Sequence, residues 1–312
     1  MRGTKLKLSA VPKQQMLINI ENIHIQPVKT LSANDVVTDI LRLDLIHPVI
    51  SGNKWFKLQY YLKEALAMKC KRLVSFGGAY SNHIVALALA GQKAGIPTTG
   101  FIRGDAPTNL SHTLKEAMSY GMELQFVSRA DYRLKDFIQN SYHQPGWYWI
   151  PEGGYGVLGA KGAAEILDIH DTSIYSHIIC ATGTGTMMAG LIQGALPTQQ
   201  ILGISVLKNH LSIFQEIQAL INKQTTKLPS FQCMHGYDWG GYGKHQPALL
   251  SFMQDFWKQE QIPTDFVYTA KMIYAIKDLI QKNHFEPGSR LLLIHSGGLQ
   301  GNRSLPSEIL PF

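Results

Sequence analysis

The chain has 312 residues, of which 45% are hydrophobic and 16% are charged. This length and composition predict a folded α/β protein of one interleaved or two adjacent domains, and they exclude an intrinsically disordered chain. The net charge of +7 is spread along the sequence without a nucleic-acid recognition motif, so we expect a basic enzyme for an anionic small substrate and no nucleic-acid partner.

The predicted elements alternate between short apolar runs and longer helical patterns, as is typical of a doubly wound parallel sheet covered by helices. In a first block we expect strands at 73–76, 98–102 and 123–127 and helices at 81–94, 110–120 and 132–140. A second block begins near Gly159, where we expect strands at 177–181, 201–206 and 290–295 and helices at 159–169, 186–193, 211–222, 246–260 and 270–282.

The cysteines and the apolar segments indicate the compartment. Cys70, Cys180 and Cys233 are odd in number and form no CxxC pair, so we expect neither a disulfide framework nor a metal site. No apolar stretch reaches the roughly 18 residues that span a bilayer, and the N-terminus lacks the apolar core of a signal peptide. We therefore expect a cytoplasmic protein without a membrane partner.

Lys54 is the first candidate for chemistry. Gly52 and Asn53 permit a turn before it, and Trp55 and Phe56 supply apolar surroundings after it. Such surroundings lower the pKa of an amine, and a lysine with a lowered pKa reacts readily with an aldehyde. Taken alone, the segment fits the start of an ordinary amphipathic helix better.

The run Thr182-Gly183-Thr184-Gly185-Thr186 follows an apolar strand and opens a helix. Free N–H groups and the helix dipole at such a turn bind anions. The run lacks the Gly-Lys-Ser/Thr of a Walker loop and the spacing of a dinucleotide site. An ordinary strand-to-helix turn fits it about equally well, and the threonines favour phosphate.

Ser81, Asn82 and His83 follow a strand and the pair Gly77-Gly78, at a predicted helix N-terminus that could bind a carboxylate. Serine and asparagine are also common helix caps, and a histidine in a first turn is commonly exposed to solvent. The Lys54 segment and the glycine-rich run flank the first block. If both contact one cofactor, residues 67–155 form a small domain inserted into a larger domain of residues 1–66 and 156–312.

Six motifs together resemble one family. They are Ser51-Gly52-Asn53-Lys54, Phe76-Gly77-Gly78-Ala79-Tyr80-Ser81-Asn82-His83, Glu152-Gly153-Gly154, the run 182–186, Val267-Tyr268-Thr269-Ala270-Lys271 and His295-Ser296-Gly297-Gly298. They resemble the 1-aminocyclopropane-1-carboxylate deaminase and D-cysteine desulfhydrase family, which belongs to the tryptophan synthase β-like, fold type II pyridoxal-phosphate enzymes.

The resemblance implies a cofactor and a set of roles. Lys54 would hold pyridoxal 5'-phosphate as an internal aldimine and then transfer protons, and residues 182–186 would hold the phosphate. Asn82 would lie near the phenolic oxygen of the cofactor, and Ser81, Asn82 and His83 would present groups to the substrate carboxylate. Ser81 would also be catalytic. The resemblance also implies a homodimer.

Tyr242 and Tyr268 match the two active-site tyrosines of the family, which face the substrate from the larger domain. From the residues alone, both fit simpler interpretations better: a loop aromatic for Tyr242 and a buried tyrosine at a strand end for Tyr268. We therefore assign catalytic and substrate-binding roles to both on the resemblance.

Two residues depart from the pattern of the family, one bearing on the substrate and the other on the phosphate. Thr269 stands where cyclopropane-opening members carry a glutamate that bonds the pyridine nitrogen, whereas the desulfhydrase-like members carry threonine. We expect a hydroxyl, from Thr269 or Ser296, to face this nitrogen, which favours elimination of a good leaving group. Met187 replaces a more usual threonine, leaving Thr184 and Thr186 to contact the phosphate.

These observations predict α,β-elimination on a small amino acid such as D-cysteine, giving an α-keto acid and ammonia. Two alternatives stay open. The nearest is cyclopropane ring opening to 2-oxobutanoate, which shares these residues, and the other is a non-catalytic protein that binds a phosphate-bearing ligand.

Overall fold

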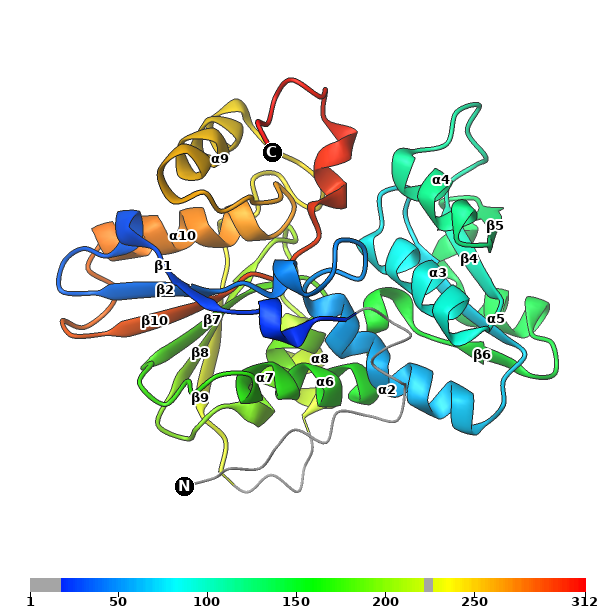
Figure 1. Cartoon of the computed structure of the whole chain (residues 1–312), viewed down its shortest axis with the longest axis horizontal. Coiled ribbons are helices and arrows are strands. Elements are labelled where there is room, and N and C mark those ends of the chain that lie inside the picture. The colour runs from blue at the N-terminus through cyan, green and yellow to red at the C-terminus, as the bar shows by residue number, and fades with distance from the viewer. Residues whose placement is uncertain (1–17, 222–226) are drawn as a thin grey trace.

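The computed structural model describes residues 18–221 and 227–312, which form two lobes, each built around its own sheet (Figure 1). The spatial order of the larger sheet is β1 (Ile25–Pro27), β2 (Val37–Leu41), β10 (Arg290–Ile294), β7 (His177–Thr182), β8 (Gln200–Ser205) and β9 (Ser230–Met234). The order of the smaller sheet is β5 (Met122–Val127), β4 (Thr98–Arg103), β3 (Arg72–Gly77) and β6 (Trp147–Trp149). All strand pairs named here are parallel except β1 with β2. The predicted α/β fold class is confirmed.

Helices cover both sheets. The α-helices are α2 (Asn53–Ala67), α3 (Asn82–Ala94), α4 (His112–Ser119), α5 (Lys135–Tyr142), α6 (Val157–Ala164), α7 (Thr186–Gly194), α8 (Ile213–Leu220), α9 (Pro247–Glu260) and α10 (Thr269–Gln281). Short 3-10 helices are η1 (Ile20–Asn22), η2 (Lys29–Leu31), η3 (Leu43–Ile46), η4 (Asp131–Arg133), η5 (Glu152–Gly154), η6 (Glu165–Asp168) and η7 (Leu299–Ser304).

The chain order of the strands bears on how the lobes are connected. The smaller sheet takes all its strands from residues 72–149, whereas the larger sheet takes strands from both sides of that stretch. In Figure 1, α2 runs from the larger lobe toward the smaller one. The exact boundaries, 67–155 against 1–66 and 156–312, stay a prediction.

Strand β10 shows why the central strands of the larger sheet are apolar throughout. Leu291 and Leu293 pack into one buried cluster with α10, while Leu292 and Ile294 pack into another with α6 and α7. Successive side chains of a strand point to opposite faces, so both faces of β10 are covered by helices. Figure 1 shows α9 and α10 on one side of this sheet and α6, α7 and α8 on the other.

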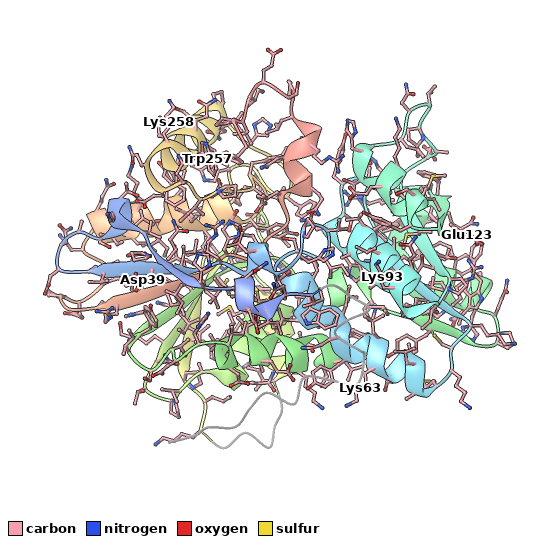
Figure 2. All side chains as sticks on the ribbon, viewed as in Figure 1. Asp39, Lys63, Lys93, Glu123, Trp257 and Lys258 are labelled. Atoms are coloured by element: carbon pink, nitrogen blue, oxygen red, sulfur yellow. The ribbon has the colours of Figure 1, made fainter. Side chains whose placement is uncertain are left out.

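The sequence does not predict four strands, β1, β2, β6 and β9. Three of them have features that hide them: β1 and β6 have three residues each, and β2 carries the polar pair Thr38 and Asp39. Both side chains are buried, and hydrogen bonds offset the cost of removing them from water. Thr38 Oγ1 donates to Leu31 O at 2.9 Å, and Asp39 accepts from Tyr175 OH at 2.7 Å. Asp39 is labelled on the larger sheet in Figure 2.

Several predicted helices are shorter than expected. The predicted helix 132–140 breaks at Leu134 (φ −96°, ψ 57°) into η4 and α5. The predicted helix 159–169 is α6 followed by η6, and 110–120 contains only α4. By contrast, α3 begins and ends as predicted, with the Ser81 hydroxyl accepting from Ile84 N and Gly95 in the left-handed conformation.

Three segments singled out in the sequence follow the carboxyl ends of parallel strands. Gly78–Ser81 follow β3, Gly183–Gly185 follow β7, and Ser296–Gly298 come shortly after β10. In parallel α/β sheets, ligands bind at this edge of the sheet. The candidate site is therefore expected there, between the two lobes.

Candidate active site

The turn before Lys54 is locked against the loop after β10. Gly52 has φ +61°, and a Cβ placed there would lie 1.8 Å from the carbonyl oxygen of Ser296. That oxygen accepts a hydrogen bond from Asn53 N at 3.1 Å. Asn53 Nδ2 also donates to Met187 Sδ at 3.2 Å, which joins the start of α2 to the first turn of α7. Residues 51–54 thus meet two other predicted motifs.

Lys54 itself is half-buried, and its Nζ donates to Asn53 Oδ1 at 2.6 Å. Burial lowers the pKa of the Lys54 amine to about 8, while the carboxylate of Asp265 acts in the opposite direction. An amine with this pKa is partly unprotonated near neutral pH, as a nucleophile toward an aldehyde requires.

A second lysine, Lys57, lies one helical turn further along α2 and is buried. Its Nζ is 3.4 Å from the carbonyl oxygen of Gly153, a long hydrogen bond for an ammonium group. Burial, and next the charge of Lys54, lower the pKa of Lys57 to about 7. The spacing of three residues from Lys54 was the available signal, but a lysine inside a helical pattern is ordinarily exposed, and sequence reasoning missed it.

At the start of α3, Asn82 faces the loop after β10. Its Nδ2 donates to Gly298 O at 3.0 Å, while its buried Oδ1 has no hydrogen-bond partner among the described residues. Ser81 is half-buried, and its hydroxyl caps α3 by accepting from Ile84 N at 3.3 Å. A buried amide oxygen without a partner suits a site that receives a polar ligand.

His83 is buried, not exposed to solvent. Ser75 Oγ donates to Ile150 O at 2.7 Å and lies 2.8 Å from His83 Nε2, so Nε2 carries the proton. Burial and the charges of Lys54 and Lys57 lower the pKa of His83 to about 3. Its Nδ1 has no partner within the described part of the chain. His83 is therefore a neutral imidazole next to both lysines.

The glycine-rich loop has the form of an anion cradle. Gly185 is left-handed (φ +72°) and leads into α7. Within residues 18–221 and 227–312, the N–H groups of Gly183, Thr184 and Gly185 donate no hydrogen bond. The Thr184 and Thr186 hydroxyls lie 3.1 Å apart. Free N–H groups at a helix N-terminus bind phosphate well.

Thr182 differs from the rest of this loop. Its hydroxyl contacts Met188 Sδ at 3.7 Å and Cys180 Sγ at 3.8 Å, and a Cβ on Gly203 of β8 would lie 2.6 Å from it. The Thr182 side chain thus packs in the interior between β8 and α7. The polar side chains at the loop are therefore those of Thr184 and Thr186.

The two predicted tyrosines meet each other beside this loop. Their ring centroids are 6.0 Å apart at 71°, and a Cβ on Gly183 would lie 3.2 Å from the Tyr268 ring. Tyr268 is half-buried, whereas Tyr242 is 51% exposed. Burial and the neighbouring Tyr242 raise the pKa of Tyr268 well above its usual value, so the Tyr268 phenol keeps its proton.

Asp265 was also missed by sequence reasoning. It is fully buried, and its carboxylate accepts hydrogen bonds from Val267 N, Tyr268 N, Thr269 N and Thr269 Oγ1 at 2.7–3.0 Å. Three of these partners are backbone N–H groups, which can only donate and so favour the ionised carboxylate, whereas burial raises the pKa of Asp265. The carboxylate thus caps the N-terminus of α10, where it binds the backbone N–H groups of residues 267–269.

Thr269 and Ser296 differ in how their hydroxyls are used. The Thr269 hydroxyl donates to Asp265 Oδ2 and accepts from Asp265 N, both at 2.7 Å. The Ser296 hydroxyl makes no hydrogen bond with any residue that the structure describes. Of the two hydroxyls predicted to face the ring nitrogen, only that of Ser296 is free for a ligand.

A cavity of about 560 Å³ opens beside the glycine-rich loop. Gly183 and Thr184 line it from the larger lobe, and Phe76, Trp149 and Glu152 line it from the smaller lobe. Gly183, which lines this cavity, also lies against the Tyr268 ring, so the tyrosine pair is close to the cavity although neither ring lines it. Its volume suits a small-molecule ligand.

Together these groups fit a phosphate-bearing aldehyde. The free N–H groups of Gly183–Gly185 and the buried ammonium of Lys57 fit a phosphate, and the Lys54 amine fits an aldehyde. The unpartnered atoms of Asn82 and Ser296 leave polar contacts for a ring. Among the described residues, we find no group of three acidic, histidine or cysteine side chains that could hold a metal ion, and no helix long and apolar enough to cross a membrane.

Comparisons with known proteins agree with this chemistry. A family model described as pyridoxal-phosphate dependent enzyme matches residues 19–297. A 1-aminocyclopropane-1-carboxylate deaminase of Bradyrhizobium diazoefficiens is 27% identical over 279 residues, covering 79% of this chain and 82% of the relative. A D-cysteine desulfhydrase of Serratia proteamaculans is 26% identical over 284 residues, covering 83% and 86%. A solved structure of an ACC deaminase homologue matches with a TM-score of 0.76 and 25% identity, covering 92% of both chains.

Proposed function

Because this chain belongs to the family of pyridoxal-phosphate dependent enzymes, we propose that it deaminates a small amino acid by α,β-elimination, giving an α-keto acid and ammonia. D-Cysteine, the substrate in the name of the Serratia relative, is our first candidate. The observation that carries the proposal is the Lys54 amine, with its pKa lowered to about 8, at the junction of α2 and α7.

The cofactor supplies an aldehyde that condenses with amines and a ring that withdraws electrons from the substrate. We assign to Lys54 both the attachment of this aldehyde and the removal of the proton from the substrate α-carbon. We assign the binding of the substrate carboxylate at the N-terminus of α3 to the Ser81 hydroxyl and to the backbone N–H groups of Asn82 and His83, because the neutral His83 ring carries its proton on Nε2, toward Ser75. The second N–H of Asn82 Nδ2 suits the phenolic oxygen of the cofactor.

We assign the phosphate of the cofactor to residues 182–186 and to Lys57. The backbone N–H groups of the loop and the hydroxyls of Thr184 and Thr186 would surround it, and Thr182 would contribute through its backbone only. Gly153 supports including Lys57, because its carbonyl oxygen is 3.4 Å from Lys57 Nζ and a Cβ on Gly153 would lie 3.6 Å from Thr184 Cγ2. A phosphate there would give this ammonium a counter-charge.

We assign the pyridine nitrogen to Ser296. Its free hydroxyl supports this choice over Thr269, whose hydroxyl is occupied by Asp265. Neither hydroxyl holds the nitrogen protonated as strongly as a carboxylate would. A weaker electron sink favours elimination of a thiolate, a good leaving group, over opening of a cyclopropane ring.

In the elimination, the bond from the α-carbon to hydrogen breaks, and the bond from the β-carbon to the leaving group breaks with it. The proton goes to Lys54 and the electron pair leaves with the thiolate. Tyr242 and Tyr268 would face this leaving group, and the protonated phenol of Tyr268 is suited to donate a hydrogen bond to it. Water then converts the released enamine into the keto acid and ammonia.

A panel of small D- and L-amino acids, with 1-aminocyclopropane-1-carboxylate included, tests the proposal by keto-acid, ammonia and sulfide release. We expect D-cysteine to give pyruvate, ammonia and sulfide. Lys54→Ala should abolish both turnover and the visible absorbance of the bound cofactor, whereas Lys63→Ala, on the exposed face of the same helix (Figure 2), should change neither. Turnover retained by the Lys54 variant would refute the assignment.

Cyclopropane ring opening is the second candidate, supported by the name of the Bradyrhizobium relative. It predicts 2-oxobutanoate from the cyclopropane amino acid and no sulfide from cysteine. A non-catalytic protein that binds a phosphate-bearing ligand would bind the cofactor and release no keto acid from any amino acid in the panel. The same panel therefore separates all three functions.

We also infer a cytoplasmic homodimer. The three free cysteines, Cys70, Cys180 and Cys233, support a reducing compartment. The resemblance to the deaminase and desulfhydrase family supports the dimer, which light scattering of the purified protein would test.

A further inference from the structure

The loop of residues 236–243, which presents Tyr242, has an unusual backbone. Trp239 has φ +53° although it carries a large side chain, and Gly240, Gly241 and Gly243 have φ +96°, +115° and +64°. A non-glycine residue in this region persists where the surrounding structure holds it. The loop therefore depends on anchors outside itself.

Lys271 supplies such an anchor from the first turn of α10. Its side chain is fully buried, and its Nζ donates to Asp238 O at 2.7 Å and to Gly241 O at 2.8 Å. The bond from Gly241 N to Asp238 O, at 3.0 Å, closes the turn between these carbonyls. Hydrogen bonds from an ammonium group are stronger than those between neutral groups. Lys271 thus fastens the turn that immediately precedes Tyr242.

Nearby charges keep this lysine in its protonated form. Burial lowers the pKa of Lys271 to about 8, and the carboxylates of Asp265 and Asp238 act in the opposite direction. Near pH 7 the ammonium form therefore predominates. A buried ammonium is retained where it has partners, and here the partners are the two carbonyl oxygens of the loop.

The same helix also sets the position of Tyr268. Tyr268 immediately precedes α10, and its N–H is held by the buried carboxylate of Asp265 at 2.7 Å. Trp239 of the loop packs edge to face on Tyr274 of α10, with ring centroids 4.8 Å apart. One rigid helix therefore fixes both Tyr242 and Tyr268.

We propose that Lys271 is a positioning residue for the elimination reaction: it ties the turn Asp238–Gly241 to α10 and so holds the Tyr242 phenol beside Tyr268 in the site. The inference rests on the proposed function, in which these two tyrosines face the leaving group. Lys271 acts through the loop and does not itself contact the substrate.

Hydrogen exchange in the cofactor-free protein tests the anchor without any assay of activity. Lys271→Met should speed exchange of the hydrogen-bonded amides within 240–244, those of Gly240, Gly241 and Lys244, by about tenfold or more, because the turn loses both of its hydrogen bonds to Lys271. Lys277→Met makes the same substitution on the exposed face of α10 and should leave these amides unchanged. Equal exchange in the two variants would overturn the anchor.

A double-mutant cycle with Tyr242→Phe tests whether Lys271 acts through the tyrosine. We expect Lys271→Met to lower kcat/KM by roughly 10- to 100-fold. If the loss is transmitted by Tyr242, Tyr242→Phe should lower kcat/KM much less in the Lys271→Met background than in the unaltered enzyme. Effects of the two substitutions that multiply fully would overturn the positioning role.

Lys271→Gln, which keeps a donor nitrogen, serves if the methionine variant does not fold. Its bonded amides at 240–244 should exchange faster than those of Lys277→Met, because a glutamine amide replaces only part of the two hydrogen bonds from the ammonium group. An unaltered protein that turns over no amino acid would overturn the proposed function, while the exchange experiment would still decide whether Lys271 holds the loop.

Discussion

The Thr269 hydroxyl both donates to the Asp265 carboxylate and accepts from the Asp265 amide, each at 2.7 Å. This reciprocal pair sits at the start of α10, directly after Tyr268. Thr269, from which the resemblance predicted desulfhydrase-like chemistry, therefore serves here in the helix cap. Its hydroxyl has no further hydrogen free for a ligand.

Thr269→Val should act on stability and leave the cofactor spectrum unchanged. The substitution removes a hydrogen bond from a buried carboxylate, so we expect the free energy of unfolding to fall by about 1–3 kcal/mol. Thr269→Ser keeps the hydroxyl and should recover most of this loss. Urea unfolding and the visible spectrum of the bound cofactor are the two measurements.

Ser296→Ala provides the contrast that decides which hydroxyl faces the ring. We expect it to change the spectrum of the bound cofactor and to lower the free energy of unfolding by less than about 1 kcal/mol, since the Ser296 hydroxyl has no partner among the described residues. The opposite pattern, with a spectral change in Thr269→Val alone, would show that the Thr269 hydroxyl, and not that of Ser296, faces the pyridine nitrogen.

Lys57→Met should weaken cofactor binding. Loss of a buried ammonium beside the phosphate loop should raise the Kd for pyridoxal 5'-phosphate by roughly tenfold or more. With its pKa near 7, Lys57 loses its charge as pH rises, so binding by the unaltered protein should weaken above pH 7 and the variant should lack this dependence. Lys63→Met is the matched control, and Kd values unaffected by Lys57→Met would exclude the residue from the phosphate site.

Asp265→Asn should make Lys54 reactive at lower pH. The Asp265 carboxylate raises the pKa of Lys54 against burial, so removing its charge lowers that pKa. Labelling of Lys54 by an acylating reagent in the cofactor-free protein, followed by mass spectrometry, should be at least about twofold faster at pH 7 than in the unaltered protein. Thr269→Val keeps the carboxylate and serves as the control. An unchanged labelling profile in Asp265→Asn would contradict the electrostatic link.

Gly52→Ala should be severe and Gly95→Ala mild, although both glycines have positive φ. A methyl group at Gly52 would lie 1.8 Å from Ser296 O, whereas at Gly95 nothing lies within 4 Å. We expect Gly95→Ala to cost the ordinary left-handed penalty of about 1–2 kcal/mol and Gly52→Ala to cost more than about 4 kcal/mol. Thermal unfolding of the two variants makes the comparison, and similar losses would show that residues 52 and 296 do not pack closely.

Local sequence patterns predicted most helices and strands, because helix caps and turns depend on residues that are close together in the chain. α3 could be bounded from Ser81 and Gly95, since a helix cap and a left-handed glycine act within one turn of the chain. Strand β2 could not be found, because its Thr38 and Asp39 are buried only through partners at Leu31 and Tyr175. From the sequence alone, polar residues such as Thr38 and Asp39 predict a loop, because the partners that allow their burial are distant in the chain.

The sequence by itself predicted the fold class, from alternating apolar runs and helical patterns, and it predicted the cofactor through the resemblance of six motifs to one family. Taken singly, Lys54, Asn82 and the glycine-rich loop each fit a simpler interpretation at least as well. Only the tertiary structure decided which polar groups are buried and which hydrogen-bond partners they have. From the sequence, Lys57 and Lys271 would be expected to be exposed lysines on helices. In the folded chain Lys57 is buried between the lobes and Lys271 under the loop 236–243, and burial lowers the pKa of both. Desolvation and pairing are properties of neighbours distant in the chain, so the assignment of Thr269 to the helix cap and of the free hydroxyl to Ser296 required the folded molecule.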